Sequence, residues 1–378
     1  MANSILEHFA DLPDPRVERT RLHRLQDIIT ISICAVICGA EGWTDMELFG
    51  KSKESWFKTF LELPNGIPSH DTFGRVISAL DPDAFERCFQ AWIQGLASSS
   101  GGKLIAIDGK SLRHSFDRAS NKAAIHMISA WATANHLVFG QITTDAKSNE
   151  ITAIPLLLEM LDLTGSTVSI DAMGCQKDIA GTIINGGGDY VFGLKANQGT
   201  LHEEVKLFLD DAIERGFKQM QHGFYQTVNG GHGRIETRRI WCTNEIDWLQ
   251  DRWAWAGFKS IAAVECQRTV DKKTTVERRY FISSLDGRDA KVMAGVIRGH
   301  WGIENGLHWS LDVSFREDDC RVRKDHGAEN LSRLRRMALN LLKQDKTVKV
   351  GVKGKRLKAG WDEQYLLKVL QIESCTQK

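Results

Sequence analysis

The stretch Leu104-Ile105-Ala106-Ile107-Asp108, followed by Gly109-Lys110-Ser111, decides how this chain folds. Four consecutive apolar residues that end in an acid and a polar turn predict a strand buried on both faces of a sheet. The same pattern returns at Ser166-Thr167-Val168-Ser169-Ile170-Asp171. A carboxylate at the end of a buried strand is desolvated and needs a positive partner. The two strands therefore predict two acids at one end of a sheet, where a divalent cation would fit.

Strand-like and helix-like patterns alternate around these two stretches. Further strands are predicted at 124–134, 137–144 and 190–194, and helices at 151–161 and 177–184. Three strands, a helix, a strand, a helix and a strand form the order of a ribonuclease H-like α/β sheet. The pattern therefore predicts an α/β fold with a mixed sheet.

Two regions follow this part of the chain. A helix at 201–213 and strand-like runs at 233–242, 260–268 and 275–283 predict a β-rich insertion over 200–290 with its own small sheet. Helical spacing then returns over 290–312 and 331–342. We expect a catalytic domain over 103–345 that contains the insertion. The remaining residues, 346–378, are predicted to form a basic C-terminal tail with a short helix at 363–370.

Residues 1–97 are predicted to form an all-helical N-terminal domain for DNA binding or association, joined to the sheet by a linker at 98–102. Pro68 and Ser69 are start signals for a short helix. This helix would expose His70, Asp71 and Arg75, as the second helix of a DNA-binding helix-turn-helix does. An ordinary surface helix of a bundle has the same pattern, so both interpretations stay open.

The composition predicts a globular protein of two or three domains, because the chain has 378 residues, of which 42% are hydrophobic and 26% charged. The net charge is only +1, but 321–358 holds thirteen Lys and Arg against three Asp and Glu. Such a basic region suggests a polyanionic partner, with a solvated tail as the alternative. Eight scattered cysteines and no signal peptide predict a reduced, cytoplasmic protein. The longest apolar stretch, 28–40, is shorter than the about 20 residues of a membrane span, so no membrane role is expected.

A third acid completes a candidate metal site. Glu304 lies on the helix predicted at 290–312 and joins Asp108 and Asp171. Mg²⁺ prefers carboxylate and water oxygens and keeps positions open for phosphate. Two such ions, about 4 Å apart, can activate an attacking oxygen and stabilise a leaving one in phosphodiester transfer.

Other side chains near these acids are candidates for supporting roles. His308 and Asp312 follow Glu304 at spacings of four, so the three share one helix face. His308 could approach the metal or the phosphate, or it could simply close the core. Asp312 is the runner-up third carboxylate, ahead of the acids at 317–319. Contacts with phosphate are predicted at the ends of two strands, for Lys110, Lys195 and Asn197.

Three motifs around the acids resemble the DDE-type insertion-sequence transposases, and most closely the H-repeat-associated proteins. These motifs are Ile107-Asp108-Gly109-Lys110, Ile170-Asp171-Ala172-Met173, and His300-Trp301-Gly302-Ile303-Glu304-Asn305 followed by Leu307-His308-Trp309-Ser310-Leu311-Asp312-Val313. The resemblance extends to Phe9–Arg16 and Pro68–Val76, so it covers nearly the whole chain. The acids lie 63 and then 133 residues apart. A long second gap is typical of this branch, in which a β-rich insertion precedes the glutamate helix.

The chain departs from the wider family around the glutamate. That family tends to place a tyrosine seven residues and an arginine four residues before the glutamate, and a lysine seven residues after it. Ile297, His300 and Leu311 occupy these positions here. Arg298 could supply the missing positive charge from a neighbouring helix face. The predicted DNA contacts therefore also include Arg298, His300, His308 and Arg75.

The resemblance implies a DNA transposase that uses two Mg²⁺ or Mn²⁺ ions held by Asp108, Asp171 and Glu304. A metal-activated water would cut the phosphodiester at an element end, and the freed 3′-hydroxyl would then attack target DNA. The implied partners are double-stranded DNA of the terminal inverted repeats and of the target, held by a homodimer or larger assembly associated with the nucleoid. Two alternatives stay open: a catalytically silent DNA-binding relic, and a metal-dependent hydrolase of small phosphoesters. The basic region and the helical domain argue against the hydrolase, because a small substrate needs neither.

Overall fold

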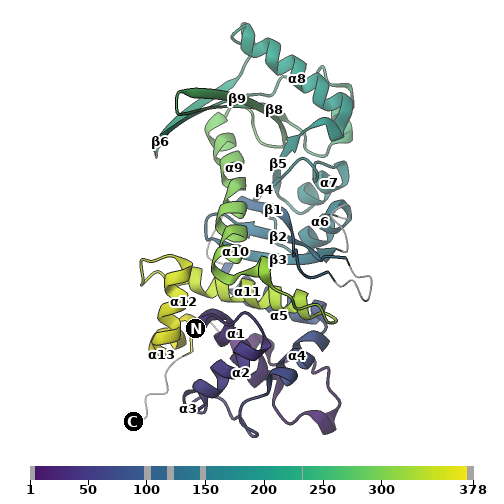
Figure 1. Cartoon of the computed structure of the whole chain (residues 1–378). Coiled ribbons are helices and arrows are strands. Elements are labelled where there is room, and N and C mark those ends of the chain that lie inside the picture. The colour runs from purple at the N-terminus through teal and green to yellow at the C-terminus, as the bar shows by residue number, and fades with distance from the viewer. Residues whose placement is uncertain (1–4, 98–103, 117–122, 145–149, 232, 373–378) are drawn as a thin grey trace.

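The fold is built around one nine-stranded mixed sheet (Figure 1). A computed structural model describes residues 5–97, 104–116, 123–144, 150–231 and 233–372, so the linker predicted at 98–102 lies outside the described residues. The strands are β1 (Leu104–Ser111), β2 (His126–Ala132), β3 (Leu137–Thr144), β4 (Thr167–Ile170), β5 (Asp189–Leu194), β6 (Gly223–Gly231), β7 (Arg234–Thr243), β8 (Ser260–Val270) and β9 (Lys273–Ser283). Their order across the sheet is β3-β2-β1-β4-β5-β9-β8-β7-β6.

Helices form the N-terminal region and cover the sheet. The N-terminal helices are α1 (Leu25–Cys38), α2 (Trp43–Ser52), α3 (Glu54–Phe57), α4 (His70–Ala79) and α5 (Pro82–Ala97), and the later ones are α6 (Glu150–Glu159), α7 (Lys177–Asn185), α8 (Gly199–Glu214), α9 (Ala290–Ile303), α10 (Trp309–Phe315), α11 (Gly327–Gln344), α12 (Val352–Trp361) and α13 (Glu363–Leu370). Figure 1 shows α1–α4, α12 and α13 at one end of the molecule and α8 with the insertion strands at the other. Among the described residues no single helix is long and apolar enough to cross a membrane, and α1 with α2 passes that test only as a pair bent by 96°.

The two apolar runs that end in Asp108 and Asp171 form neighbouring strands, β1 and β4, at the centre of the sheet. β1 pairs in parallel with β4 over Leu104–Ile107 and antiparallel with β2 as far as Ser111. β5 lies beyond β4, and β3 lies beyond β2. The elements therefore follow the predicted order of three strands, a helix, a strand, a helix and a strand. β1 continues past Asp108, which the sequence pattern places at its end, because β2 keeps pairing with it.

The prediction that the insertion has its own small sheet is wrong. β9 pairs antiparallel with β5 from Val191↔Ser283 to Leu194↔Tyr280, so the insertion strands continue the central sheet. The sequence pattern also misses β6, in which glycines weaken the strand signal. Close packing requires a glycine at position 223 of β6, because a Cβ there would lie 2.6 Å from the carbonyl oxygen of Arg288.

Helix α11 joins the N-terminal helices to the sheet. Its residues from Gly327 to Leu342 are all buried, in contact with α1, α4, α5 and β3. Asn340 exchanges two hydrogen bonds of 2.9 Å with the backbone of Val138, which satisfies the outer edge of β3. The buried guanidinium of Arg333 donates to Glu86 of α5 at 2.9 Å. The N-terminal helices and the sheet therefore share one hydrophobic core.

The described part of 346–378, predicted as a basic C-terminal tail with a short helix at 363–370, packs onto the rest of the protein. It forms α12 and α13, which pack against α1 and α11. Arg356 lies over the ring of Phe315 and donates to the carbonyl oxygen of Val36 at 2.9 Å, near the C-terminal end of α1. Five cations of the basic region are buried: Arg333, Arg335, Arg336, Lys355 and Arg356. Much of the positive charge counted in the sequence therefore serves the core and is not available to a polyanion.

Candidate active site

The pairing of β1 with β4 brings Asp108 and Asp171 side by side. Ile107 and Ile170 are direct partners in this parallel pair, and the two acids are the next residues along. Neighbouring strands lie about 5 Å apart, and equivalent residues of a parallel pair point to the same face. Asp171 also closes the turn after β4, because its Oδ1 accepts a hydrogen bond of 3.0 Å from the backbone amide of Met173.

Glu304 lies in the helical run that follows the insertion. The sequence predicts one helix here, but α9 and α10 are joined by a π-turn at Glu304–His308. The backbone amide of Trp309 donates to the carbonyl oxygen of Glu304, five residues back rather than four. A Cβ at Gly306 would lie 2.9 Å from the Trp131 ring, so the missing side chain lets this turn pack closely on the sheet. Such π-turns are frequent at functional sites.

The acids affect one another's charge. Burial and the carboxylate of Asp171, with smaller contributions from Glu304 and Glu150, raise the pKa of Asp108 to about 7. Ionising such a group is costly until positive charge is brought close. In the described part of the chain, however, no three His, Cys, Asp or Glu side chains lie close enough together to hold one metal ion. The structure therefore brings the three predicted acids into electrostatic contact without showing a complete ligand set.

His308 packs beside the first acid as an uncharged group. Its Nδ1 lies 3.6 Å from Oδ2 of Asp108. Burial, followed by the charges of Arg336 and Lys110, lowers the pKa of His308 to about 3, so the contact is not an ion pair at neutral pH. Its Nε2 is buried without a hydrogen-bond partner among the described residues. The structure thus favours a place beside the acids over the cationic phosphate contact predicted from the sequence.

Lys110 is held inside a cluster of acids instead of facing solvent. Its side chain is only 9% exposed, and its ammonium group lies 2.7, 2.6 and 3.8 Å from three carboxylates, those of Asp312, Asp318 and Glu317. Glu317 also accepts hydrogen bonds from the buried guanidinium of Arg336 at 2.9 Å and from the Ser332 hydroxyl at 2.7 Å. The predicted phosphate contact is therefore replaced by an anchoring role, in which Lys110 ties β1 to the segment after α10. Asp312, the runner-up third carboxylate, is engaged in the same cluster.

Glu317 predicts a loss of stability in acid. Burial raises the pKa of this carboxyl group, but Arg336 and Lys110 outweigh burial and lower it to about 2. Because the unfolded value is about 4.3, this group stabilises the fold fully above that pH, and the contribution is lost as the pH falls toward 2. Urea midpoints measured from pH 7 to pH 2.5 should therefore fall more for the wild type than for Glu317→Gln, which has no such proton to gain. Equal falls in the two proteins would contradict this assignment.

Lys195 and Arg279 share an exposed surface near the third acid. Lys195 is exposed just beyond β5, as predicted for a phosphate contact. Arg279 of β9, which the sequence analysis does not single out, donates twice to Glu277 at 2.7 and 3.1 Å, and its guanidinium lies 5.2 Å from the centre of the Trp301 ring. Hydrogen bonding to Glu277 and, more weakly, the charge of Glu304 raise the pKa of Arg279. No local motif reveals Arg279, because only the pairing of β9 with β5 brings it to this place.

Two other residues predicted as DNA contacts bond instead to the strand of Asp171 or to the turn after it. Asn197 donates to the carbonyl oxygen of Ala172 at 2.6 Å and so fastens the turn that follows Asp171. His300 Nδ1 lies 3.1 Å from the Ser169 hydroxyl of β4, and burial lowers the pKa of this histidine. Both side chains are therefore placed to hold the strand of Asp171.

The remaining two predicted contacts are exposed cations on other surfaces. Arg298 is exposed on α9. Burial raises the pKa of Glu236 in β7, but a hydrogen bond from Cys266 and the charges of several arginines, including Arg298, lower it overall. Arg298 therefore lies near β7 of the insertion, while Arg279 is an arginine whose pKa the charge of Glu304 helps to raise. Arg75 is exposed on α4, a helix whose first turn is capped by the Ser69 hydroxyl as predicted.

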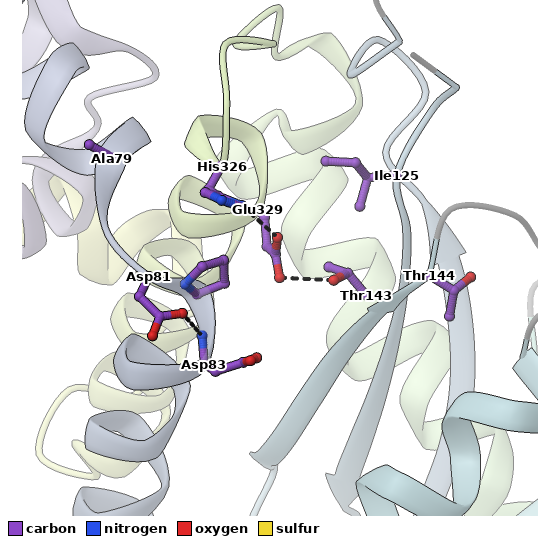
Figure 2. Close-up of a pocket in the computed structure, with 9 residues that line it drawn as sticks. Ala79, Asp81, Asp83, Ile125, Thr143, Thr144, His326 and Glu329 are labelled. Carbon is purple, nitrogen blue, oxygen red and sulfur yellow. Dashed lines mark hydrogen bonds and ion pairs between the residues drawn. The ribbon is translucent and has the colours of Figure 1, made fainter. Parts of the chain in front are cut away.

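A cavity of about 650 Å³ opens between the α4–α5 connection, the start of β2, the end of β3 and the start of α11 (Figure 2). None of its lining residues is a predicted site residue; they are Ala79, Asp81, Pro82, Asp83, Ile125, Thr143, Thr144, His326 and Glu329. Glu329 already accepts a hydrogen bond from the Thr143 hydroxyl at 2.9 Å and pairs with Arg333 at 2.8 Å. The candidate site is therefore the group of acids on β1, β4 and the π-turn, and not this cavity.

Comparison with known proteins gives consistent results along the chain. A family model described as “Transposase DDE domain” matches residues 99–341, and one described as “DDE_Tnp_1-associated” matches residues 6–93. The chain is 43% identical to the “H repeat-associated putative transposase YhhI” of Escherichia coli K12, over 97% of each chain. It is also 43% identical to the “Putative transposase YncI” of Escherichia coli O157:H7, over 99% of this chain and 95% of that one.

One solved structure, the cryo-EM structure of the piggyBac transposase synaptic complex with hairpin DNA, matches over 98% of this chain and 78% of that one. The TM-score is 0.45 and the sequence identity 11%, so the argument for the family rests on the sequence relatives. Their identity extends over nearly the full length of both chains. The chain belongs to the family of transposases with a DDE domain, and its relatives include H repeat-associated proteins.

Proposed function

We propose that this transposase cuts and joins DNA strands at the ends of an insertion sequence by metal-dependent phosphodiester transfer. The observation that carries the proposal is the placement of Asp108 and Asp171 on neighbouring parallel strands, with Glu304 close enough to affect the charge of Asp108. The elements from β1 to β5 follow the chain order predicted for a ribonuclease H-like fold and form one mixed sheet in the order β3-β2-β1-β4-β5, and we propose that fold for this part of the chain.

Asp108, Asp171 and Glu304 are the residues that would hold the divalent cations. All three donors are carboxylates, which Mg²⁺ and Mn²⁺ prefer. The raised pKa of Asp108 supports this assignment, because a buried acid beside other acids lacks the positive charge that a cation brings. Two such cations supply Lewis acidity that activates the attacking oxygen and stabilises the leaving one.

Side chains around the acids keep them in place for this reaction. The uncharged imidazole of His308 fills the space beside Asp108 without adding a positive charge that would compete with a cation. Lys110 ties β1 to the segment after α10, and Asn197 fastens the turn after Asp171. These contacts hold both strand ends in place while a DNA strand binds.

The exposed surface of Lys195, Arg279 and Trp301 is the part of the molecule that we assign to the DNA backbone near the acids. An arginine stacked on an indole ring keeps its planar donors oriented, and such donors match phosphate oxygens. Arg75 on α4 is a second candidate contact, in the N-terminal region. The resemblance to insertion-sequence transposases implies an assembly that pairs two element ends, and we propose a homodimer or a larger assembly on DNA.

Removing the cations of this surface should reduce the salt dependence of DNA binding. Each phosphate contact on duplex DNA contributes about 0.9 to the slope of log affinity against log salt concentration. We expect Lys195→Ala and Arg279→Ala each to lower the slope by about that amount, measured by fluorescence anisotropy on duplexes from the DNA that flanks the gene. Arg215→Ala, which removes an exposed arginine at the end of α8, is the matched control and should leave the slope unchanged. An unchanged slope in the double variant would exclude this surface from the DNA path.

The second candidate function is that of a catalytically silent DNA-binding relic. It is favoured by the absence, among the described residues, of three acids close enough to share a metal ion. Full-length protein incubated with Mg²⁺ or Mn²⁺ and DNA from both flanks of the gene separates the candidates. Metal-dependent nicks and joined products would support the transposase reaction, whereas binding without nicking would support the relic. Turnover of a small phosphoester without affinity for DNA would instead support the hydrolase.

A further inference from the structure

A second polar cluster packs against β1 directly after Asp108. His126 of β2 lies between two partners, because its Nδ1 is 2.9 Å from the Ser111 hydroxyl and its Nε2 is 2.5 Å from Oε1 of Glu150. The side chains of His126 and Glu150 are only 3% and 8% exposed. Burying such groups costs free energy even when they are paired. The Nε2 contact is close but lacks hydrogen-bond geometry, and Nε2 has no hydrogen-bond partner among the described residues. Through its two contacts His126 links β1, β2 and α6.

The cluster packs on the part of β1 that has only one neighbouring strand. β4 pairs with β1 only as far as Ile107, so β2 is the only strand that pairs with residues 108–111 in the described part of the chain. A Cβ at Gly109 would lie 2.7 Å from Oε1 of Glu150 and closer still to the His126 ring. Only a glycine at this position lets the pair press directly on the backbone. The contact therefore supports β1 at the residue next to the first acid.

We propose that Glu150 and His126 are positioning residues for Asp108, which fix the backbone of β1 at Gly109, the residue next to this acid. This inference rests on the proposed function, because it assigns the cluster to the same cation site. Glu150 begins α6, so the chain of contacts from Ser111 through His126 joins β1, β2 and α6 at one point.

Binding of Mn²⁺ to the full-length protein tests the inference without DNA or turnover. The dissociation constant is obtained from the loss of the free Mn²⁺ signal in an electron paramagnetic resonance titration. We expect Glu150→Gln to raise this constant about 10-fold or more, which is the usual effect of losing a group that supports a metal ligand. Glu159→Gln, an exposed carboxylate at the other end of α6, is the matched control and should bind like the wild type. Glu150→Asp keeps the charge and should recover part of the affinity, which a purely structural side chain would not do.

A milder variant keeps the test decisive if Glu150→Gln does not fold. Ser111→Ala removes only the exposed end of the link, and loss of one hydrogen bond should weaken Mn²⁺ binding about 5-fold. Thermal midpoints from circular dichroism report folding separately from metal binding. Affinities within about 2-fold of the wild type, in each of Glu150→Gln and Ser111→Ala that folds, would overturn the positioning role. In that case the proposed function would still stand if Asp108→Asn abolished Mn²⁺ binding. A wild-type protein with no Mn²⁺ binding that depends on Asp108 would overturn both.

Discussion

Asp108→Asn is expected to lower the rate of Mn²⁺-dependent strand cleavage about 1,000-fold, because it removes a charge worth about 4 kcal/mol to the transition state. The same substitution should not destabilise the fold. Burial and Asp171 oppose the charge of Asp108, so an uncharged side chain of the same shape removes an unfavourable interaction. Single-turnover cleavage at saturating Mn²⁺ and urea unfolding at pH 7 measure the two effects on the same protein.

Asp178→Asn is the matched control for this experiment, since Asp178 is an exposed acid in the first turn of α7, shortly after Asp171. It should leave the cleavage rate unchanged. The same assay identifies the third acid: Glu304→Gln should be as slow as Asp108→Asn, and Asp312→Asn should be faster than either. The reverse result would transfer the role of Glu304 to Asp312. A rate for Asp108→Asn within about 10-fold of the wild type would contradict the proposed chemistry.

Glu317→Gln is expected to lower the free energy of unfolding by about 3–5 kcal/mol, because it leaves a buried guanidinium without its counter-ion. The side chains of Glu317 and Arg336 are both 0% exposed, and Oε1 and Nη1 lie 2.9 Å apart. The Ser332 hydroxyl also donates to this carboxylate, and Lys110 lies 3.8 Å from it. Urea unfolding at pH 7, followed by circular dichroism, measures the loss.

Asp319→Asn is the control for this effect, because Asp319 is 61% exposed and pairs with Arg316 at the surface. Its loss should be below about 1 kcal/mol. Combining Glu317→Gln with Arg336→Met should recover part of the stability, since the second change removes the unpaired charge. Similar losses for Glu317→Gln and Asp319→Asn would show that the buried pair does not support the fold.

The parts of the fold that the sequence predicts are those set by near neighbours in the chain. β1 and β4 appear as apolar runs because both faces of these strands are buried. The start of α4 is visible because the Ser69 hydroxyl caps a backbone amide three residues later. The pairing of β5 with β9 has no such local signal, so the insertion looked like a separate sheet. β6 was hidden because its glycines weaken the strand signal, and the packing that explains Gly223 involves residues far away in the chain.

The same distinction applies to the candidate site. Asp108 and Asp171 could be predicted because each follows a buried strand, but Arg279 and Glu150 arrive through tertiary contacts. Lys110 looked like a phosphate contact because its burial among acids is not visible in the sequence. The basic stretch 321–358 shows the same limit of sequence reasoning, since a count of charges does not reveal that five of its thirteen cations lie inside the protein.

The hydrogen bonds between β5 and β9 join the insertion strands and the strands of the acids in one continuous sheet. Arg279 on β9 is therefore connected, through β5, to β4 and the turn at Asp171 by backbone pairing. The insertion therefore cannot be removed without disturbing the central sheet. Deleting 223–283 would leave β5 as an edge strand, unpaired on one side, and exposed edge strands promote aggregation by pairing with other chains.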